Sequence, residues 1–323
     1  EKETKINFHT PVGCLYVNPN GSDNYLEQAA PLGKNFNARY SRFEDGNSLN
    51  TSYPDFHFPA SSKGLFEDAP SGYINPRLLI KAQLEVCVKN NGTILNYIVE
   101  DVIHENTGIK IITREGKNIR ANKALVAAGA FTNSLNLLDK KLFFRLKSET
   151  TIWGKVSNEE AHRLNTLPSL LYEIDTPEIQ NIYLIQPVQY PDGAYYLKMG
   201  ANISEDIYFE SLEDMQKWFC SVDTKLNLQI LQKALMQIMP GINVKEFVTK
   251  KCIVTRTKHG KPYVGSMNRK GLFVAAGGNG YGAMSSDALG HIAAHLLIKE
   301  TFPEEFDEKD FEPSYAINSN IAL

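Results

Sequence analysis

The chain of 323 residues is poor in cysteine and has no strong excess of charge of either sign. Its four cysteines are widely spaced without a CxxC pair, which argues against disulfide pairing and predicts a reducing, cytoplasmic location. A net charge of −3 and a pI near 6.2 leave no basic stripe, so we expect no nucleic-acid partner. No signal peptide opens the sequence, and apolar runs such as residues 124–130 are too short to span a membrane.

What is present is enough apolar sequence, 42% of the residues, for a large core. Asn75 and Pro76 predict the start of a helix that ends near residues 90–92, followed by strand 93–102 and a hairpin of residues 109–113 and 118–120. Residues 123–130 predict a fully buried strand. Residues 151–250 change to short antiparallel strands, 182–185 and 194–199, with one helix near 226–239. The pattern predicts an α/β (α+β) protein with an inserted antiparallel domain.

The C-terminal part contains the most informative pattern. A buried strand over residues 271–276 leads into a turn with four glycines in six residues, 277–282, and residues 285–287 predict the cap of a helix. Such a glycine density indicates that something approaches the backbone closely, and a helix N-terminus stabilises negative charge. A reduced flavin ring fits this description, and a turn with only a packing role is the alternative. No G-x-G-x-x-G motif follows a predicted strand.

Three stretches give the chain a family resemblance. Residues 72–79 (GYINPRLL), 124–131 (ALVAAGAF) and 258–282, which begin KHGKPYVG and end in the glycine turn, resemble the D-amino-acid-oxidase-like FAD-dependent oxidoreductases. The closest resemblance is to monomeric sarcosine oxidase and glycine oxidase. It implies a Rossmann-like FAD-binding domain over residues 71–141 and 257–323, interleaved with an antiparallel substrate domain over residues 1–70 and 142–256.

The resemblance also implies what should precede these segments. Family members open with a strand, a G-x-G-x-x-G turn and a helix that hold the FAD pyrophosphate. We expect this unit to be missing from the sequence at hand, either truncated or present on another chain.

The resemblance implies a set of cofactor-binding positions. Val99 stands where the family presents backbone groups to the adenine, with an ordinary strand valine as the alternative. Gly129 stands where the family chain passes close to FAD, with an ordinary strand-end glycine as the alternative. The glycine turn adds the remaining positions, which are Gly278, Asn279, Gly280, Gly282 and Met284, and Tyr281 is expected near the flavin ring.

Two reactive residues fall at functional positions of the sarcosine oxidases. Lys198 stands where a lysine over the flavin promotes reaction with O2, because an ammonium stabilises the negative charge formed on oxygen. A solvated lysine on a strand face is the alternative. Cys252 stands where the flavin is attached through sulfur, and Lys250, Lys251 and Arg256 are candidates for lowering its pKa. A buried, inert strand cysteine is the alternative.

Other positions depart from the family pattern. Val254 and Met284 replace residues that read the substrate carboxylate, and Asn202 replaces a histidine. Because a buried carboxylate needs a cation or several donors, simple glycine or sarcosine is disfavoured as substrate. Arg256 and Lys258 remain as candidate anion partners.

The resemblance implies an FAD-dependent oxidase of a secondary amine or amino acid, with hydride transfer to flavin and reoxidation by O2 or another acceptor. One alternative is a dehydrogenase of a hydroxy acid or phosphate ester that passes electrons to a quinone or protein. A subunit of a larger flavoprotein complex is another. The His291/His295 pair has no third ligand in view, so no metal site is expected.

Overall fold

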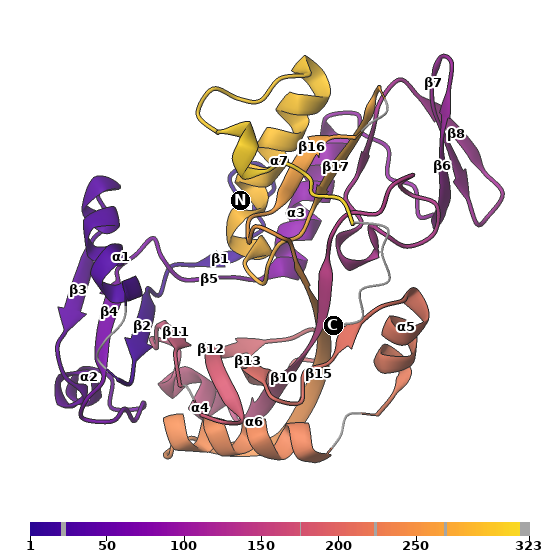
Figure 1. Cartoon of the computed structure of the whole chain (residues 1–323). Coiled ribbons are helices and arrows are strands. Elements are labelled where there is room, and N and C mark those ends of the chain that lie inside the picture. The colour runs from indigo at the N-terminus through magenta and orange to yellow at the C-terminus, as the bar shows by residue number, and fades with distance from the viewer. Residues whose placement is uncertain (21–23, 175, 223–224, 268–269, 317–323) are drawn as a thin grey trace. The chain divides into compact units, whose positions relative to one another are not determined.

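The structure is a computed structural model that describes residues 1–20, 24–174, 176–222, 225–267 and 270–316 (Figure 1). The chain forms two compact units. Unit 1 contains Glu1–Ala82, Glu149–Asp206 and Ser221–Cys252, and unit 2 contains Gln83–Ser148, Ile207–Cys220 and Ile253–Leu323. Which segments bind FAD and which bind substrate stays a prediction from the sequence.

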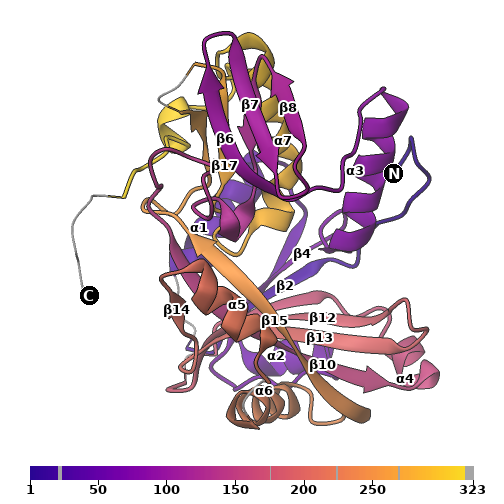
Figure 2. The ribbon, with the colours of Figure 1, turned by 90° about the vertical axis from the view of Figure 1, so that its right-hand side faces the viewer.

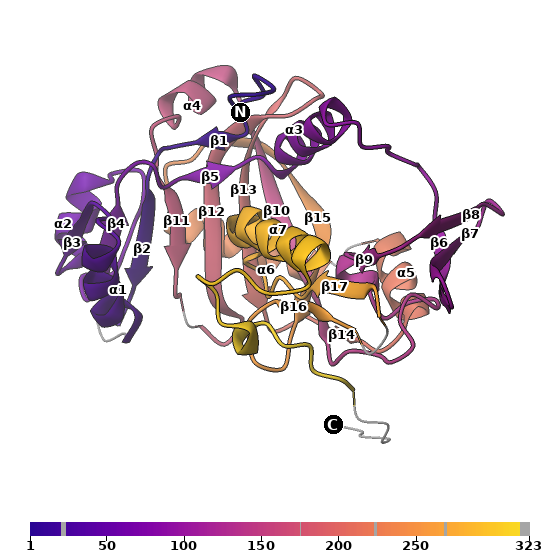
Figure 3. The same ribbon diagram turned by 90° about the horizontal axis from the view of Figure 1, so that it is seen from above.

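Unit 1 is built on a large, mainly antiparallel sheet. Its strand order can be followed in Figure 3 and runs β15 (Val244–Arg256), β10 (Arg145–Val156), β13 (Tyr195–Ile203), β12 (Ile179–Gln189), β11 (Ser169–Tyr172), β2 (Cys14–Asn18), β4 (Lys63–Glu67) and β3 (Tyr40–Phe43). Among the described strand pairs of this series, β11 and β2 run parallel. A short ribbon pairs β1 (His9–Thr10) with β5 (Tyr73–Ile74). The helices are α1 (Asn24–Asn35), α2 (Gly46–Ser52), α4 (Asn158–Arg163) and α6 (Lys225–Ile238).

The two faces of the unit 1 sheet differ because side chains alternate along each strand. Ile152, Leu184, Leu197 and Met199 point to one face and are completely buried. Helix α6 lies against the sheet in Figures 1 and 2. Its buried residues Leu231, Ala234, Leu235 and Ile238 share one core cluster with this face. The residues between them in sequence therefore lie on the opposite face, which carries polar and aromatic side chains.

Unit 2 contains a mixed sheet of β16 (Tyr263–Ser266), β17 (Leu272–Ala276) and β9 (Ala124–Val126), in which β9 and β17 run parallel. Helix α7 (Gly282–Lys299) packs on it through Ile292, Ala293 and Leu296, beside β16 and β17 in Figure 1. A second sheet joins β6 (Val99–Glu105), β7 (Gly108–Thr113) and β8 (Asn118–Ala121). The other elements are β14 (Tyr208–Phe209), α5 (Leu212–Cys220) and the 3₁₀ turns η1 (Gly129–Phe131) and η2 (Glu308–Asp310).

Helix α3 (Pro76–Lys89) begins as the sequence predicts. The Asn75 side-chain oxygen accepts hydrogen bonds from the amides of Arg77 and Leu78, and Asn91, with φ 64°, follows the last turn. The predicted α/β fold class is confirmed, as are the hairpin of β7 and β8 and the helix near residue 226.

Three local predictions were wrong. Residues 123–130 do not form one buried strand: β9 ends at Val126, because Gly129 adopts a left-handed φ of 55° and opens a 3₁₀ turn, and Leu125 on the edge strand is 36% exposed. Strand β6 starts only at Val99 rather than at residue 93. Residues 151–250 contain helices α4 and α5 besides α6, since short amphipathic stretches fold there between strands.

None of the helices in the described residues combines the length and the apolar character needed to cross a bilayer.

Candidate functional site

The glycine turn of unit 2 is held in place by one buried asparagine. The Asn279 side chain donates to the carbonyl of Gly277 (2.7 Å) and accepts from the amide of Thr257 (2.9 Å), and its own amide donates to the carbonyl of Thr255 (3.0 Å). These bonds tie the turn to the end of β15. Asn279 is thus a clamp whose left-handed φ of 52° sets the path of the chain before α7.

Two glycines of this turn are required by the protein itself. Gly277 has φ 83°, and a Cβ there would lie 2.3 Å from the Thr257 side chain. At Gly278 a Cβ would approach the Cα of Gly282 to 3.0 Å, so the chain needs glycine for the close return of the turn. Packing therefore explains part of the glycine density.

Gly282 has no such explanation. Its φ is not left-handed, and a Cβ would meet no atom within 4 Å. It is the first residue of α7, and no side chain caps this helix. The sequence had predicted a start at residues 285–287; the helix begins earlier because the turn itself delivers the chain into helical geometry. An uncapped helix start beside open space is suited to an anionic or polarised group.

The other predicted positions around this turn divide into exposed and buried ones. Tyr281 and Met284 are exposed, at 62% and 71%, whereas Val254 is buried beneath the turn, 3.8 Å from where a Cβ of Gly280 would lie. Arg256 is half-buried near the end of β15. Exposed aromatic and thioether side chains flank the bare helix start.

Val99 and Gly129 lie elsewhere in unit 2. Val99 is half-buried and packs against the cluster formed by Val126, Leu137 and Val274. Gly129 begins the 3₁₀ turn after β9, and a Cβ there would again meet nothing within 4 Å. Its left-handed φ is sufficient reason for glycine, so this position carries no separate sign of a ligand.

Lys198 lies on the polar face of the unit 1 sheet. It pairs with Trp153 on β10 and with Ile185 on β12, and its side chain is half-buried. Its Nζ lies 5.3 Å from the centroid of the Tyr183 ring, a cation–π contact. A solvated lysine, the alternative left open by the sequence, does not describe this side chain.

Burial lowers the pKa of Lys198, and the negative charges of Glu149 and of a Cys252 thiolate oppose that shift. Burial also raises the pKa of Tyr183, as do the charge of Glu149 and its hydrogen bond to the tyrosine. Tyr183 is therefore a neutral phenol at physiological pH. Lysine, phenol, thiol and carboxyl group form one electrostatic cluster within unit 1.

Cys252 is exposed, so the alternative of a buried strand cysteine is wrong. Of its basic neighbours, Lys251 points to the opposite side of β15 and donates to the Ser221 hydroxyl at 2.9 Å. Lys250 shares the side of Cys252 and lies 5.9 Å from the Trp153 ring. The other cysteines of the described chain, Cys14, Cys87 and Cys220, are not part of this cluster.

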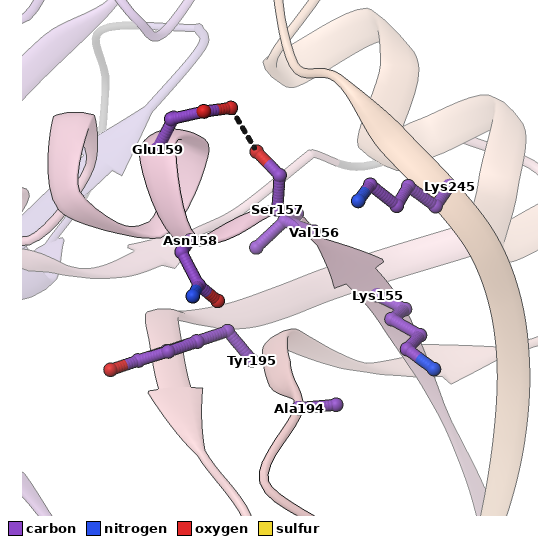
Figure 4. Close-up of a pocket in the computed structure, with 8 residues that line it drawn as sticks. All are labelled: Lys155, Val156, Ser157, Asn158, Glu159, Ala194, Tyr195 and Lys245. Carbon is purple, nitrogen blue, oxygen red and sulfur yellow. Dashed lines mark hydrogen bonds between the residues drawn. The ribbon is translucent and has the colours of Figure 1, made fainter.

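An aromatic group extends the polar face beside Lys198. Trp153 lies 4.4 Å from Tyr190 and 5.8 Å from Tyr196 between ring centroids. Figure 4 shows a separate open pocket at the end of β10, lined by Lys155, Val156, Ser157, Asn158, Glu159, Ala194, Tyr195 and Lys245. None of the predicted site residues lines this pocket.

The family model described as FAD dependent oxidoreductase (DAO) matches residues 1–296. The chain belongs to this family. It is an FAD-dependent oxidoreductase, as the sequence resemblance implied. A search of curated protein sequences found no match for it.

Solved structures share the fold of this family member. NikD, described as an unusual amino acid oxidase essential for nikkomycin biosynthesis, is 15% identical with a TM-score of 0.74, covering 98% of this chain and 79% of that one. Amadoriase I, a fructosyl amine:oxygen oxidoreductase from Aspergillus fumigatus, is 16% identical with a TM-score of 0.70, and the match covers 94% of this chain and 69% of that one. Iminodiacetate oxidase from Chelativorans sp. BNC1 is 15% identical with a TM-score of 0.68, and the match covers 97% of this chain and 79% of that one.

The residues present fit FAD. Gly282 leaves open space at the start of α7, which has no side-chain cap, so a flat, polarised group has room there. The resemblance had marked this turn, but it had not marked Tyr183 or Glu149. These two reach Lys198 only through the pairing of β10, β12 and β13, so no local sequence signal could have found them.

Proposed function

We propose that this FAD-dependent oxidoreductase is an oxidase of a secondary amine or amino acid that uses O2 as its electron acceptor. The observation that carries the proposal is Lys198, a half-buried cation held over a tyrosine ring on the polar face of the unit 1 sheet. The names of NikD, Amadoriase I and iminodiacetate oxidase, which share the fold, describe oxidation of amino acids or amines.

The overall reaction balances without a protein acid or base. When bound, FAD would supply the two-electron oxidation of the carbon next to nitrogen and the delivery of those electrons to O2. The amine becomes an imine after losing its N–H proton, and O2 takes up two electrons and two protons to give hydrogen peroxide. The uncapped amides at Gly282 and Ala283 stabilise negative charge on the cofactor, and Lys198 stabilises negative charge that develops on oxygen.

The substrate is proposed to be other than free glycine or sarcosine. Val254 is buried and Met284 is apolar, so neither provides a donor for a small carboxylate. Arg256, half-buried at the end of β15, is the proposed partner for an anionic substrate group. The remaining proposed cofactor contacts are Val99, Gly129, Gly278, Asn279 and Gly280, with Tyr281 near the flavin ring.

We further propose that Cys252 holds the flavin covalently. Its exposure supports this, because a sulfur that forms a thioether must be accessible to the ring. No disulfide joins the four cysteines of the described residues, which fits a reducing compartment such as the cytoplasm.

The visible spectrum of the flavin-loaded enzyme tests the proposal. We expect a candidate secondary amine or amino acid to bleach the flavin bands without oxygen, and air to restore them with release of hydrogen peroxide. Bleaching only by hydroxy acids or phosphate esters, with slow recovery in air and fast recovery with a quinone, would identify a dehydrogenase instead.

A further inference from the structure

The register of the unit 1 sheet brings a carboxylate to the lysine. Thr151 on β10 pairs with Gly200 on β13, and Trp153 pairs with Lys198. Glu149 lies two residues before Thr151 and therefore on the same face as Lys198. The neighbouring strand places Tyr183 directly opposite Gly200.

The Tyr183 ring is fixed between these two charged groups. It lies against Gly200, where a Cβ would come 2.2 Å from a ring carbon, so only glycine allows this position. Its hydroxyl is hydrogen-bonded to the Glu149 carboxylate, and its ring faces the Lys198 ammonium. Glu149 thus positions the Tyr183 ring through a hydrogen bond, and the ring contacts the Lys198 ammonium.

The charges around Lys198 come from each strand packed against it. Glu149 on β10 favours the ammonium, and a Cys252 thiolate on β15 does so only where its sulfur is not attached to flavin, while Tyr183 on β12 is a neutral phenol. Lys250, also on β15, is a like charge above the adjacent Trp153. Burial by itself favours the neutral amine. Glu149 is the one carboxylate among the charges that act on Lys198 within the described residues.

We propose that Glu149 is a positioning residue for Lys198, keeping the ammonium charged and fixed over the site by its own charge and through its hydrogen bond to Tyr183. This inference deepens the proposed function and rests on it for its catalytic consequence. The effect of Glu149 on the protonation of Lys198 can also be measured without turnover, by titrating the lysine itself.

The direct measurement is the titration of Lys198. Lysines of the flavin-loaded enzyme are labelled by reductive ¹³C-methylation, and the Lys198 resonance is assigned by its loss in Lys198→Met. In Glu149→Gln we expect its pKa to fall by about one unit or more, the size of shift that an opposite charge nearby produces. Glu178→Gln is the matched control, because Glu178 is exposed beside the same sheet; there the titration should not move.

The same change predicts a kinetic signature. Reoxidation is fast while Lys198 is protonated and is lost as pH rises through its pKa, so the loss should occur at lower pH in Glu149→Gln. An unchanged Lys198 titration in folded Glu149→Gln would overturn the proposal. If that variant does not fold, Tyr183→Phe replaces it: breaking the hydrogen bond should lower the same pKa by a smaller amount, and no change would overturn the proposal equally.

The two proposals can fail separately. A shifted lysine titration with a pH profile of reoxidation that stays in place would support the positioning role of Glu149 and refute the role of Lys198 in oxygen reduction.

Discussion

Replacing Lys198 by methionine removes a charge and little else. Methionine retains an unbranched apolar stem that can pass the Tyr183 ring, so the sheet should keep its packing. The kinetic consequence should fall on the reaction with oxygen, because that half-reaction places negative charge on O2 and its first electron transfer limits the rate.

The half-burial of Lys198 sets the size of the effect. Two unit charges about 4 Å apart interact by about 1 kcal/mol in water and by about 4 kcal/mol at an effective dielectric constant of about 20, the value suited to a partly buried site. Loss of about two thirds of the latter, about 2.7 kcal/mol, corresponds to about a hundredfold in rate at about 1.36 kcal/mol per decade. We therefore expect reoxidation to slow by at least about a hundredfold.

Stopped-flow measurement separates the two half-reactions. Anaerobic reduction by substrate should change by less than about tenfold, since hydride transfer creates no charge on oxygen. Lys250→Met is the control, because Lys250 is an exposed cation on the neighbouring strand and its removal should leave reoxidation nearly unchanged. Equal slowing of both half-reactions would mean that Lys198 only shapes the site, and unchanged reoxidation would refute the oxygen role.

Three further outcomes are expected. Acid denaturation should leave the flavin colour with the protein, and Cys252→Ser should release it into the supernatant; free flavin from the unaltered enzyme would contradict the thioether. Gly282→Ala should reduce flavin content without lowering the melting temperature, because its methyl group meets no protein atom, whereas Gly290→Ala in the same helix should retain flavin and gain up to about 1 kcal/mol of stability. Lys198→Met should gain most stability relative to the unaltered protein near neutral pH. Burial lowers the pKa of Lys198 in the folded state, so the unfolded chain keeps the proton to higher pH. The stability advantage of Lys198→Met must therefore shrink as pH rises towards 10.5. A melting-temperature difference that does not depend on pH would show that Lys198 carries no such burial cost.

Local sequence was sufficient for much of the fold. Asn75 and Pro76 mark the start of α3 because capping is settled within one helical turn. The glycine spacing over residues 277–282 marked the turn before α7, and the family resemblance assigned it to FAD. The capping pattern of residues 285–287 misplaced the first residue of the helix, because Gly282 begins α7 without a side-chain cap and so gives no capping signal.

Burial along β9 could not be predicted in the same way. Residues 123–130 are apolar throughout, and an apolar run is equally compatible with a central strand and an edge strand. Leu125 is partly exposed because β9 has a described partner, β17, on one side only. Sheet position is a property of the assembled strands.

The sequence by itself determined the family, the cofactor class and the residue that carries the oxygen chemistry in our proposal, since these follow from local motifs and their order. Only the tertiary structure decided what surrounds Lys198. Glu149 and Tyr183 lie far from it along the chain, and a shift of one residue in strand register would turn each of them to the opposite face. Register is set by the burial of Ile152, Leu184, Leu197 and Met199 under α6, and that choice is made by the whole core at once.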